Sequence, residues 1–346
     1  MASALGAVTT KADLGRADAS ARWDAIVGSS TDRSLDAWSD RLLAAGRITL
    51  NFHPDRVTRP GSTVAAGLLA DGRYRSQWVT GISNGSRSAL AGGDRHRFER
   101  DLFDGAYDGA DPAAVELPVY GALDLLDCPF GGSPRFGSSF VVLRPHMLAR
   151  TTLCVGDSYV GPPEVGTVAA PWCLLAGLAE QAAAGRLLDR PLGVADLLAV
   201  LDGDRSASSA ARTLDGYVEA QVHGGVDLAT DVEAIVVDPS FAGSDVERDL
   251  SAAAARYGFA YRWHPGSELA AGAVPPGFRG PTVVEWARRV ARPDGVVDAQ
   301  AIGAAAPRAV PDLRPGGDEP DSVLQQLKYL WHAVFALGHD AESMGR

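Results

Sequence analysis

The segment YVEAQVH, residues 217–223, alternates polar and apolar side chains. As a β-strand it would place Tyr217, Glu219, Gln221 and His223 on one face, because every second side chain points the same way. Polar groups that are buried without partners cost roughly 1 to 3 kcal/mol each. The floor of a cleft would satisfy this face, and a solvent-facing sheet edge is the alternative. The apolar run DVEAIVVD that follows is typical of a central strand and favours the cleft.

A second polar row lies in ITLNFHP, residues 48–54, where His53 ends a predicted strand just before Pro54. An imidazole at the rim of a sheet could orient a ligand. A histidine that is hydrogen-bonded to backbone is the alternative, since nothing local requires chemistry of it.

Two further segments offer hydrogen-bond donors to a polar ligand. YRSQWVTGISNG, residues 74–85, ends in a turn, and GGSPRFGSSF, residues 131–140, combines an arginine with small residues that let backbone amides approach a phosphate. The candidate binding residues in these segments are Arg75, Ser76, Thr80, Ser83, Asn84 and Arg135. The sequence has no Walker A, GxGxxG or HExxH pattern.

Hydrophobic periodicity predicts the elements that carry these residues. We expect helices at residues 20–27, 34–45, 245–257 and 322–337, and one or two helices within 167–201. Strands are expected at residues 48–53, 75–83, 138–143, 151–155, 217–223, 232–237 and 259–263. Residues 292–320, rich in Pro, Gly, Ala and Asp, resemble a linker. The order of elements indicates an α+β fold rather than a regular βαβ alternation.

Composition limits the classes of partner. The 346 residues carry 32 Lys plus Arg and 43 Asp plus Glu, a net charge of −11 that disfavours binding to nucleic acid. The three cysteines, Cys128, Cys154 and Cys173, lack the spacing of a disulfide framework or a zinc site. No segment is long and apolar enough to predict a membrane span, so we expect a cytoplasmic protein without a membrane partner.

Three blocks of the sequence together resemble the ADP-ribosyltransferase superfamily. They are the strand ending in Phe52-His53, the passage VAAGLLADGRYRSQWVTGIS, and YVEAQVHGGVDLATDVEAIVV. The whole chain is also similar to a bacterial family labelled as a domain of unknown function. The superfamily resemblance covers most of residues 47–263 and implies a mixed, mainly antiparallel split-sheet core.

The resemblance also implies an enzyme that transfers ADP-ribose from NAD, its substrate, to an acceptor that could be a protein or a small molecule. Glu219 would match the catalytic glutamate, and His53 the residue that orients the nicotinamide ribose. A carboxylate suits this role because cleavage of the nicotinamide bond builds an oxocarbenium-like cation. Tyr120 is a candidate for the family's central tyrosine, and Gln221 and His223 for cofactor contacts. Tyr217 stands where members that modify arginine have Gln or Glu, and no Ser-Thr-Ser strand is present.

The domain organisation expected from these patterns has three consecutive parts. An N-terminal helical segment, residues 1–46, precedes a catalytic α+β domain, residues 47–265, with a helical insertion near 167–201. A C-terminal extension, residues 266–346, contains the linker and a terminal helix.

Two other functions fit parts of the sequence. A metal-dependent hydrolase could use His53, Asp55, Asp157 and His223, since His-x-Asp at a strand end can bind a divalent ion. A non-enzymatic domain that binds NAD or a partner could use the terminal helix around Tyr329, Trp331 and Phe335.

Overall fold

The computed structural model describes residues 2–30, 34–58, 62–80, 93–111, 117–161, 164–204, 211–309 and 320–341. The chain folds into two compact units, each built from non-consecutive segments. The first unit comprises Met1–Leu50, Gly92–Ser133 and Val142–Val226, and the second comprises Asn51–Ala91, Pro134–Val141 and Asp227–Arg346. The fold is α+β, as predicted, with a mixed, mostly antiparallel open sheet. The three consecutive domains expected from the sequence stay a prediction.

Strands of the first unit pair antiparallel in the order β1 (Arg47–Phe52), β3 (Val119–Asp124), β7 (Val218–Val222), β5 (Thr151–Val155) and β6 (Val165–Thr167). Strand β1 pairs with β3, and β3 pairs with β7. On its other side β7 pairs with β5, which pairs with β6. Strand β7 is therefore an interior strand, and the alternative of a solvent-facing edge is wrong for residues 218–222.

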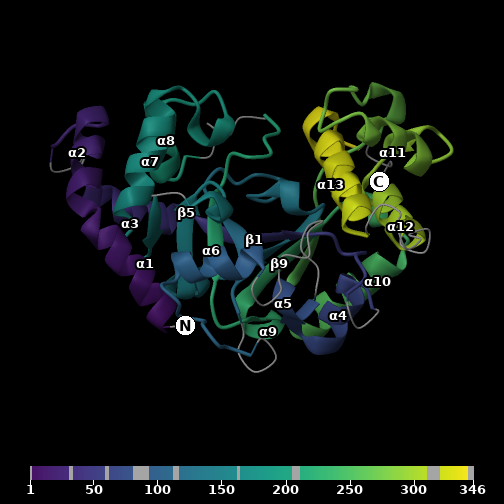
Figure 1. The fold of residues 1–346 in the computed structure, drawn as a ribbon, viewed down its shortest axis with the longest axis horizontal. Helices are drawn as coiled ribbons and strands as arrows, with labels where there is room; N and C mark the ends of the chain where they lie inside the picture. Colours follow the sequence, from purple (N-terminus) through teal and green to yellow (C-terminus); the bar gives the residue numbers. More distant parts are fainter. Residues whose placement is uncertain are drawn as a thin grey trace. The chain divides into compact units, whose positions relative to one another are not determined.

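Helices of the first unit pack together beside this sheet (Figure 1). They are α1 (Ala2–Leu14), α2 (Arg16–Ile26), α3 (Leu35–Ala45), α7 (Trp172–Ala183) and α8 (Val194–Leu201). Helix α6 (Asp94–Leu102) instead contacts the segment Ser158–Val160. Helix α7 contacts α2, α3 and α8, and its Leu174 and Leu178 are fully buried. Short 3-10 segments occur at Pro145–Arg150, Ser158–Val160 and Leu187–Asp189. The burial of one face of each helix supplies most of the stability that short helices lack alone.

The strands of the second unit are arranged around β9 (Val232–Val237), which lies between β4 (Ser139–Leu143) and β10 (Ala260–Trp263). Strands β9 and β10 are parallel and are joined by α10 (Asp245–Tyr257). Helix α10 has a Ser244 N-cap and ends at Gly258, whose positive φ of 79° a glycine adopts without strain. The carboxyl ends of β9 and β10 consequently meet at one edge.

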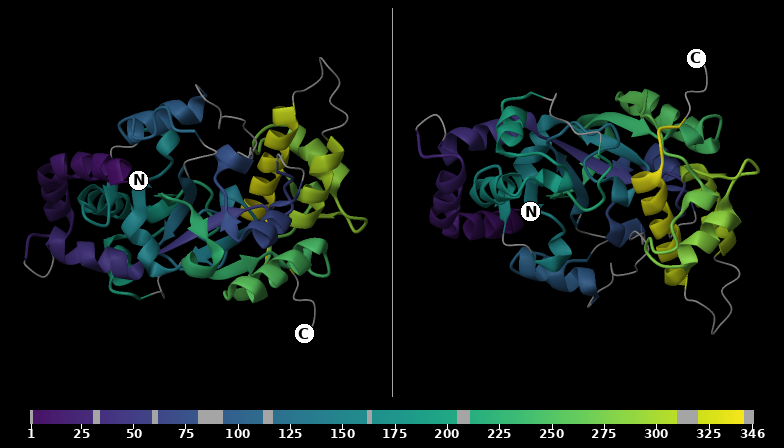
Figure 2. Two further views of the ribbon diagram at one scale, coloured as in Figure 1. Left: turned by 90° about the horizontal axis from the view of Figure 1, so that it is seen from below. Right: turned by 90° about the horizontal axis from the view of Figure 1, so that it is seen from above.

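The remaining elements of the second unit are mostly short. Helices are α4 (Val64–Asp71), α5 (Gln77–Thr80), α9 (Leu228–Asp231), α11 (Thr282–Val290), α12 (Ala299–Ala309) and α13 (Pro320–Leu337). Short strands are β2 (Arg73–Tyr74), β8 (Val226–Asp227), β11 (Leu269–Ala270) and β12 (Val296–Val297), and 3-10 segments occur at Pro134–Phe136, Pro239–Phe241 and Ala271–Ala273. Helix α13 packs against α11 and α12, and α4 packs against α10 (Figure 2). None of the described helices is both long and apolar enough to cross a membrane.

Most predicted elements are confirmed, and two predictions are wrong. The strand expected over residues 75–83 is a helical turn at Gln77–Thr80, where the Ser76 carbonyl accepts from the amides of Val79 and Thr80. The linker expected over residues 292–320 contains α12, because its alanines favour helix and Ile302 and Ala306 bury one face. Residues 81–83 and 310–319 lie outside the described residues.

Candidate functional site

The polar face of β7 lies at the centre of the first unit's sheet. Antiparallel register places Tyr120 opposite Gln221, with Thr152 opposite Gln221 on the other side. Directly opposed residues point to the same face of a sheet, so Tyr120 and Thr152 flank Gln221, whereas Ala122 and Cys154 flank Glu219. Glu219 is 4% exposed and Gln221 is 0% exposed. The face expected to floor a cleft is therefore buried within the unit.

Glu219 is a buried carboxylate held by hydrogen bonds. Gln221 Nε2 donates to Glu219 Oε1 at 2.8 Å, and Ser158 forms a second side-chain hydrogen bond. Burial raises the pKa of Glu219 to about 7, and the negative charge of Asp157 acts in the same direction. Near neutral pH this group can therefore exist in both protonation states, which suits acid–base or electrostatic chemistry.

A directed hydrogen-bond chain links His223 to Glu219. The Thr152 hydroxyl donates to Gln221 Oε1 at 2.7 Å, so it must accept from His223 Nε2, which lies 3.0 Å away. His223 Nδ1 is then the acceptor for the Tyr107 hydroxyl at 2.7 Å. Burial lowers the pKa of His223 to about 3, which keeps the ring neutral. In this series of hydrogen bonds, from Tyr107 to Gln221, every donor points toward Glu219.

Helix α6 supplies residues to this site that the sequence reasoning missed. The Tyr120 hydroxyl donates to Glu99 Oε1 at 2.8 Å, and Arg95 Nη1 lies 3.6 Å from the same oxygen. The Arg95 guanidinium stacks 4.4 Å from the centroid of the Tyr120 ring, and its charge acts to lower the pKa of Glu219. Arg95 Nε and Nη1 are buried and have no hydrogen-bond partner among the described residues.

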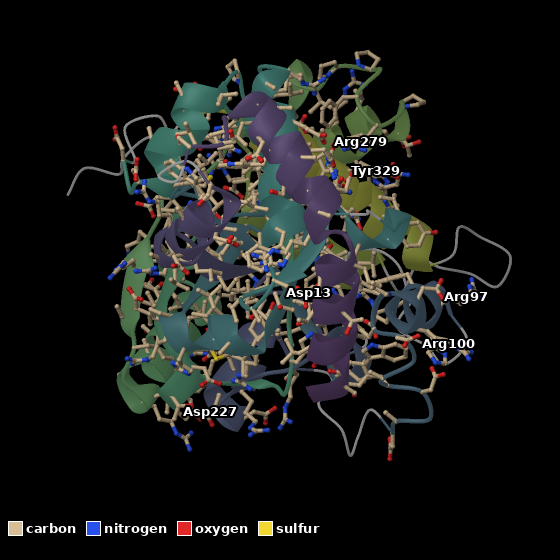
Figure 3. All side chains as sticks on the ribbon, turned by 90° about the vertical axis from the view of Figure 1, so that its left-hand side faces the viewer. Asp13, Arg97, Arg100, Asp227, Arg279 and Tyr329 are labelled. Carbon is tan, nitrogen blue, oxygen red and sulfur yellow. The ribbon has the colours of Figure 1, made fainter. Side chains whose placement is uncertain are left out.

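The sequence did carry a signal for this inward face of α6. Arg95 and Glu99 are spaced i, i+4 in DRHRFER and therefore share a helix face, while Phe98 lies beside them. Arg97 and Arg100 of the same helix are exposed (Figure 3). No sequence signal identified Thr152 or Tyr107, because their roles depend on contacts between distant segments.

Other residues expected at the site belong to the second unit. His53 is 8% exposed, and its ring lies edge-on to Trp331 with centroids 5.6 Å apart. Arg75 is exposed and lies 3.3 Å from Asp71 Oδ2, whereas the Thr80 hydroxyl donates to the Ser76 carbonyl at 3.2 Å. Arg135 is part of the 3-10 segment Pro134–Phe136. Ser83 and Asn84 lie outside the described residues.

The residues of the metal hypothesis are distributed over both units. Asp157 and His223 belong to the first unit, and Asp157 lies close enough to Glu219 to raise its pKa. His53 and Asp55 follow β1 in the second unit. Among the described residues, no three His, Cys, Asp or Glu side chains are placed to hold one metal ion. The donor geometry therefore gives the metal-dependent hydrolase no support.

Comparison with known proteins identifies the family. The chain belongs to the family described as "Protein of unknown function (DUF3626)", whose model matches residues 47–336. It is also similar to the "Gene 2 protein" of Mycobacterium phage L5, with 28% identity over 174 residues. That alignment covers 49% of this chain and 59% of the phage protein. The matched family region contains β1, β7 and α6, and so includes the residues around Glu219.

Proposed function

We propose that this protein transfers ADP-ribose from NAD to an acceptor, with Glu219 as the catalytic carboxylate. The proposal combines the three-block resemblance to ADP-ribosyltransferases, including their split-sheet core, with one observation. Glu219 lies on an interior strand, in a network whose donors all point toward it. Such a network holds a carboxylate in a fixed position, as stabilisation of a developing cation requires.

The residues around Glu219 would have separate tasks in this reaction. Ionised Glu219 would stabilise the positive charge that forms on the ribose as the bond to nicotinamide breaks. Gln221 and Ser158 would orient the carboxylate through their hydrogen bonds. Arg95, whose buried donors have no hydrogen-bond partner among the described residues, would bind an anionic or carbonyl group of the substrate. The role of His53 at the ribose stays a prediction from the resemblance.

Release of nicotinamide from labelled NAD tests the proposal. Glu219→Gln removes the charge but keeps the shape, and it should lower kcat by about 100- to 1000-fold. Because the ionised form is required and the pKa of Glu219 is about 7, wild-type kcat should rise with pH through about 7. Glu233→Gln, which changes an exposed carboxylate on β9, is the matched control and should keep full activity. Equal release by the wild type and Glu219→Gln would exclude Glu219 from the mechanism.

The burial of Glu219 favours a second candidate function. All of the hydrogen-bond partners that the described residues give Glu219 are protein groups, so these contacts can hold the carboxylate in place without a reaction at it. A domain that binds NAD without cleaving it would fit this arrangement. Calorimetry with NAD would then give binding in both wild type and Glu219→Gln, and neither would release nicotinamide.

A further inference from the structure

Two buried histidines of the second unit lie beside α13. His53 follows β1, and its ring lies against that of Trp331. His332, the next residue after Trp331 on α13, is 0% exposed. His332 Nε2 lies 3.2 Å from the carbonyl oxygen of Arg135, and Trp331 Nε1 donates to the carbonyl of Pro134 at 2.8 Å. The end of β1, the 3-10 segment Pro134–Phe136 and α13 therefore meet at these rings.

Each histidine has a buried ring nitrogen that the described residues do not satisfy. A carbonyl oxygen can only accept, so His332 Nε2 carries the hydrogen and Nδ1 of the neutral ring has a lone pair. Neither His332 Nδ1 nor His53 Nε2 has a hydrogen-bond partner among the described residues. Buried polar atoms normally have partners, so these two nitrogens can take a hydrogen bond from a ligand or an ordered water.

The charges that act on the two rings are positive. Burial lowers the pKa of His53, and the charges of Arg56, His332 and Lys328 lower it further. Burial also lowers the pKa of His332, to about 3, with smaller contributions from Lys328, Arg135 and Arg279. We name the two histidines and these four cations, Arg56, Arg135, Arg279 and Lys328, the basic cluster. Asp55 interacts with Arg56, and Asp55 also acts on the buried carboxyl group of Asp238. In a chain with a net charge of −11, such a concentration of cations produces a local field that attracts anions.

Aromatic rings fix the position of two of these cations. The Arg279 guanidinium lies 5.9 Å from the centroid of the Tyr329 ring (Figure 3), and that of Arg135 lies 5.1 Å from the Phe136 ring. Arg279 also has a positive φ of 56°, which is strained for a residue with a side chain. Backbone strain of this kind persists where the surrounding structure holds a residue in a required position.

We propose that the basic cluster binds the phosphate group of a phosphorylated small molecule. A tetrahedral phosphate accepts hydrogen bonds from several directions, and the cations of the cluster come from four separate segments of the unit. Arginine forks match phosphate oxygens bidentately, and lysine adds a point charge. A phosphate monoester keeps one hydroxyl in its monoanionic form, and that hydroxyl can donate to the lone pair of His332 Nδ1, whereas an ionised carboxylate has no hydrogen to donate. This proposal does not depend on the proposed reaction at Glu219.

Calorimetry with pyrophosphate on the full chain tests this site. Wild type should bind pyrophosphate, with weaker binding as salt increases because the interaction is electrostatic. Lys328→Gln and Arg279→Gln should each weaken binding about tenfold, since each removes one charge from the cluster. Arg262→Gln changes an exposed cation on β10 of the same unit and should bind as the wild type does. Thermal unfolding of each variant confirms that it is folded.

Two comparisons make the test specific. Citrate, a multivalent carboxylate, should bind at least tenfold more weakly than pyrophosphate if phosphate geometry is recognised. Glu219→Gln should bind pyrophosphate as the wild type does. The test of phosphate binding at the basic cluster is therefore independent of whether this variant cleaves NAD. Absence of pyrophosphate binding, equal binding of citrate, or equal binding by wild type and Lys328→Gln would overturn it.

Discussion

Replacement of Glu219 by glutamine should change how the stability of the protein depends on pH. Glutamine has the same shape, and its carbonyl oxygen can still accept from Gln221 Nε2, but it does not titrate. In the wild type, burial favours the protonated carboxyl group. The contribution of Glu219 to stability is therefore fully present below pH 4.5, the unfolded value, and is lost as pH rises through about 7.

The size of this effect follows from the pKa. A rise from 4.5 to about 7 corresponds to roughly 3 kcal/mol at about 1.36 kcal/mol for each pH unit. The free energy of unfolding of Glu219→Gln, relative to wild type, should therefore increase by about 3 kcal/mol between pH 4 and pH 8. The histidines that are buried in neutral form also make stability depend on pH, but they are the same in both proteins and cancel in the difference.

Urea unfolding of both proteins at several pH values measures this difference, with fluorescence as the signal and equal m values as the check on comparability. Glu233→Gln again serves as the control, because it replaces an exposed carboxylate. A constant difference between wild type and Glu219→Gln from pH 4 to pH 8 would show that Glu219 titrates as an ordinary carboxylate, and the argument from burial would be refuted.

Two structural predictions concern the second unit. A Cβ on Gly303 would lie 1.3 Å from Asp55 Oδ2, so Gly303→Ala should lower the free energy of unfolding by about 2 kcal/mol. Adding Asp55→Ala to Gly303→Ala should restore most of this lost free energy. Additive losses in this double-mutant cycle would contradict the contact. Ser244 accepts from the Glu247 amide at the start of α10, so Ser244→Ala should lower the melting temperature through a loss of about 1 kcal/mol, whereas Ser251→Ala, on the exposed face of α10, should not.

The polar face of β7 was predictable because alternation is a local property of the sequence. Tyr217, Glu219, Gln221 and His223 could be assigned to one face from spacing alone. Their neighbours could not be assigned, because Thr152 and Tyr107 reach this face through contacts between distant segments. The sequence therefore predicted a polar face but not the protein groups that satisfy and bury it.

Two helices of the second unit show where local patterns are ambiguous. Residues 75–80 contain alternating polar residues around Trp78, and this pattern fits either a short strand or one helical turn. In α12, Pro and Gly obscured a helix whose alanines and buried Ile302 stabilise it. The basic cluster was equally hidden, since Arg56, Arg135, Arg279 and Lys328 are far apart in the chain.

The interior position of β7 also determines how firmly its side chains are held. Its backbone amides are bonded to β3 or β5, so they can exchange with solvent only when the sheet of the first unit opens. Loops and helix ends open far more often than such a strand. The backbone that carries Glu219 therefore fluctuates little, and adjustment to a ligand must come from side chains around the carboxylate, above all Arg95 of α6.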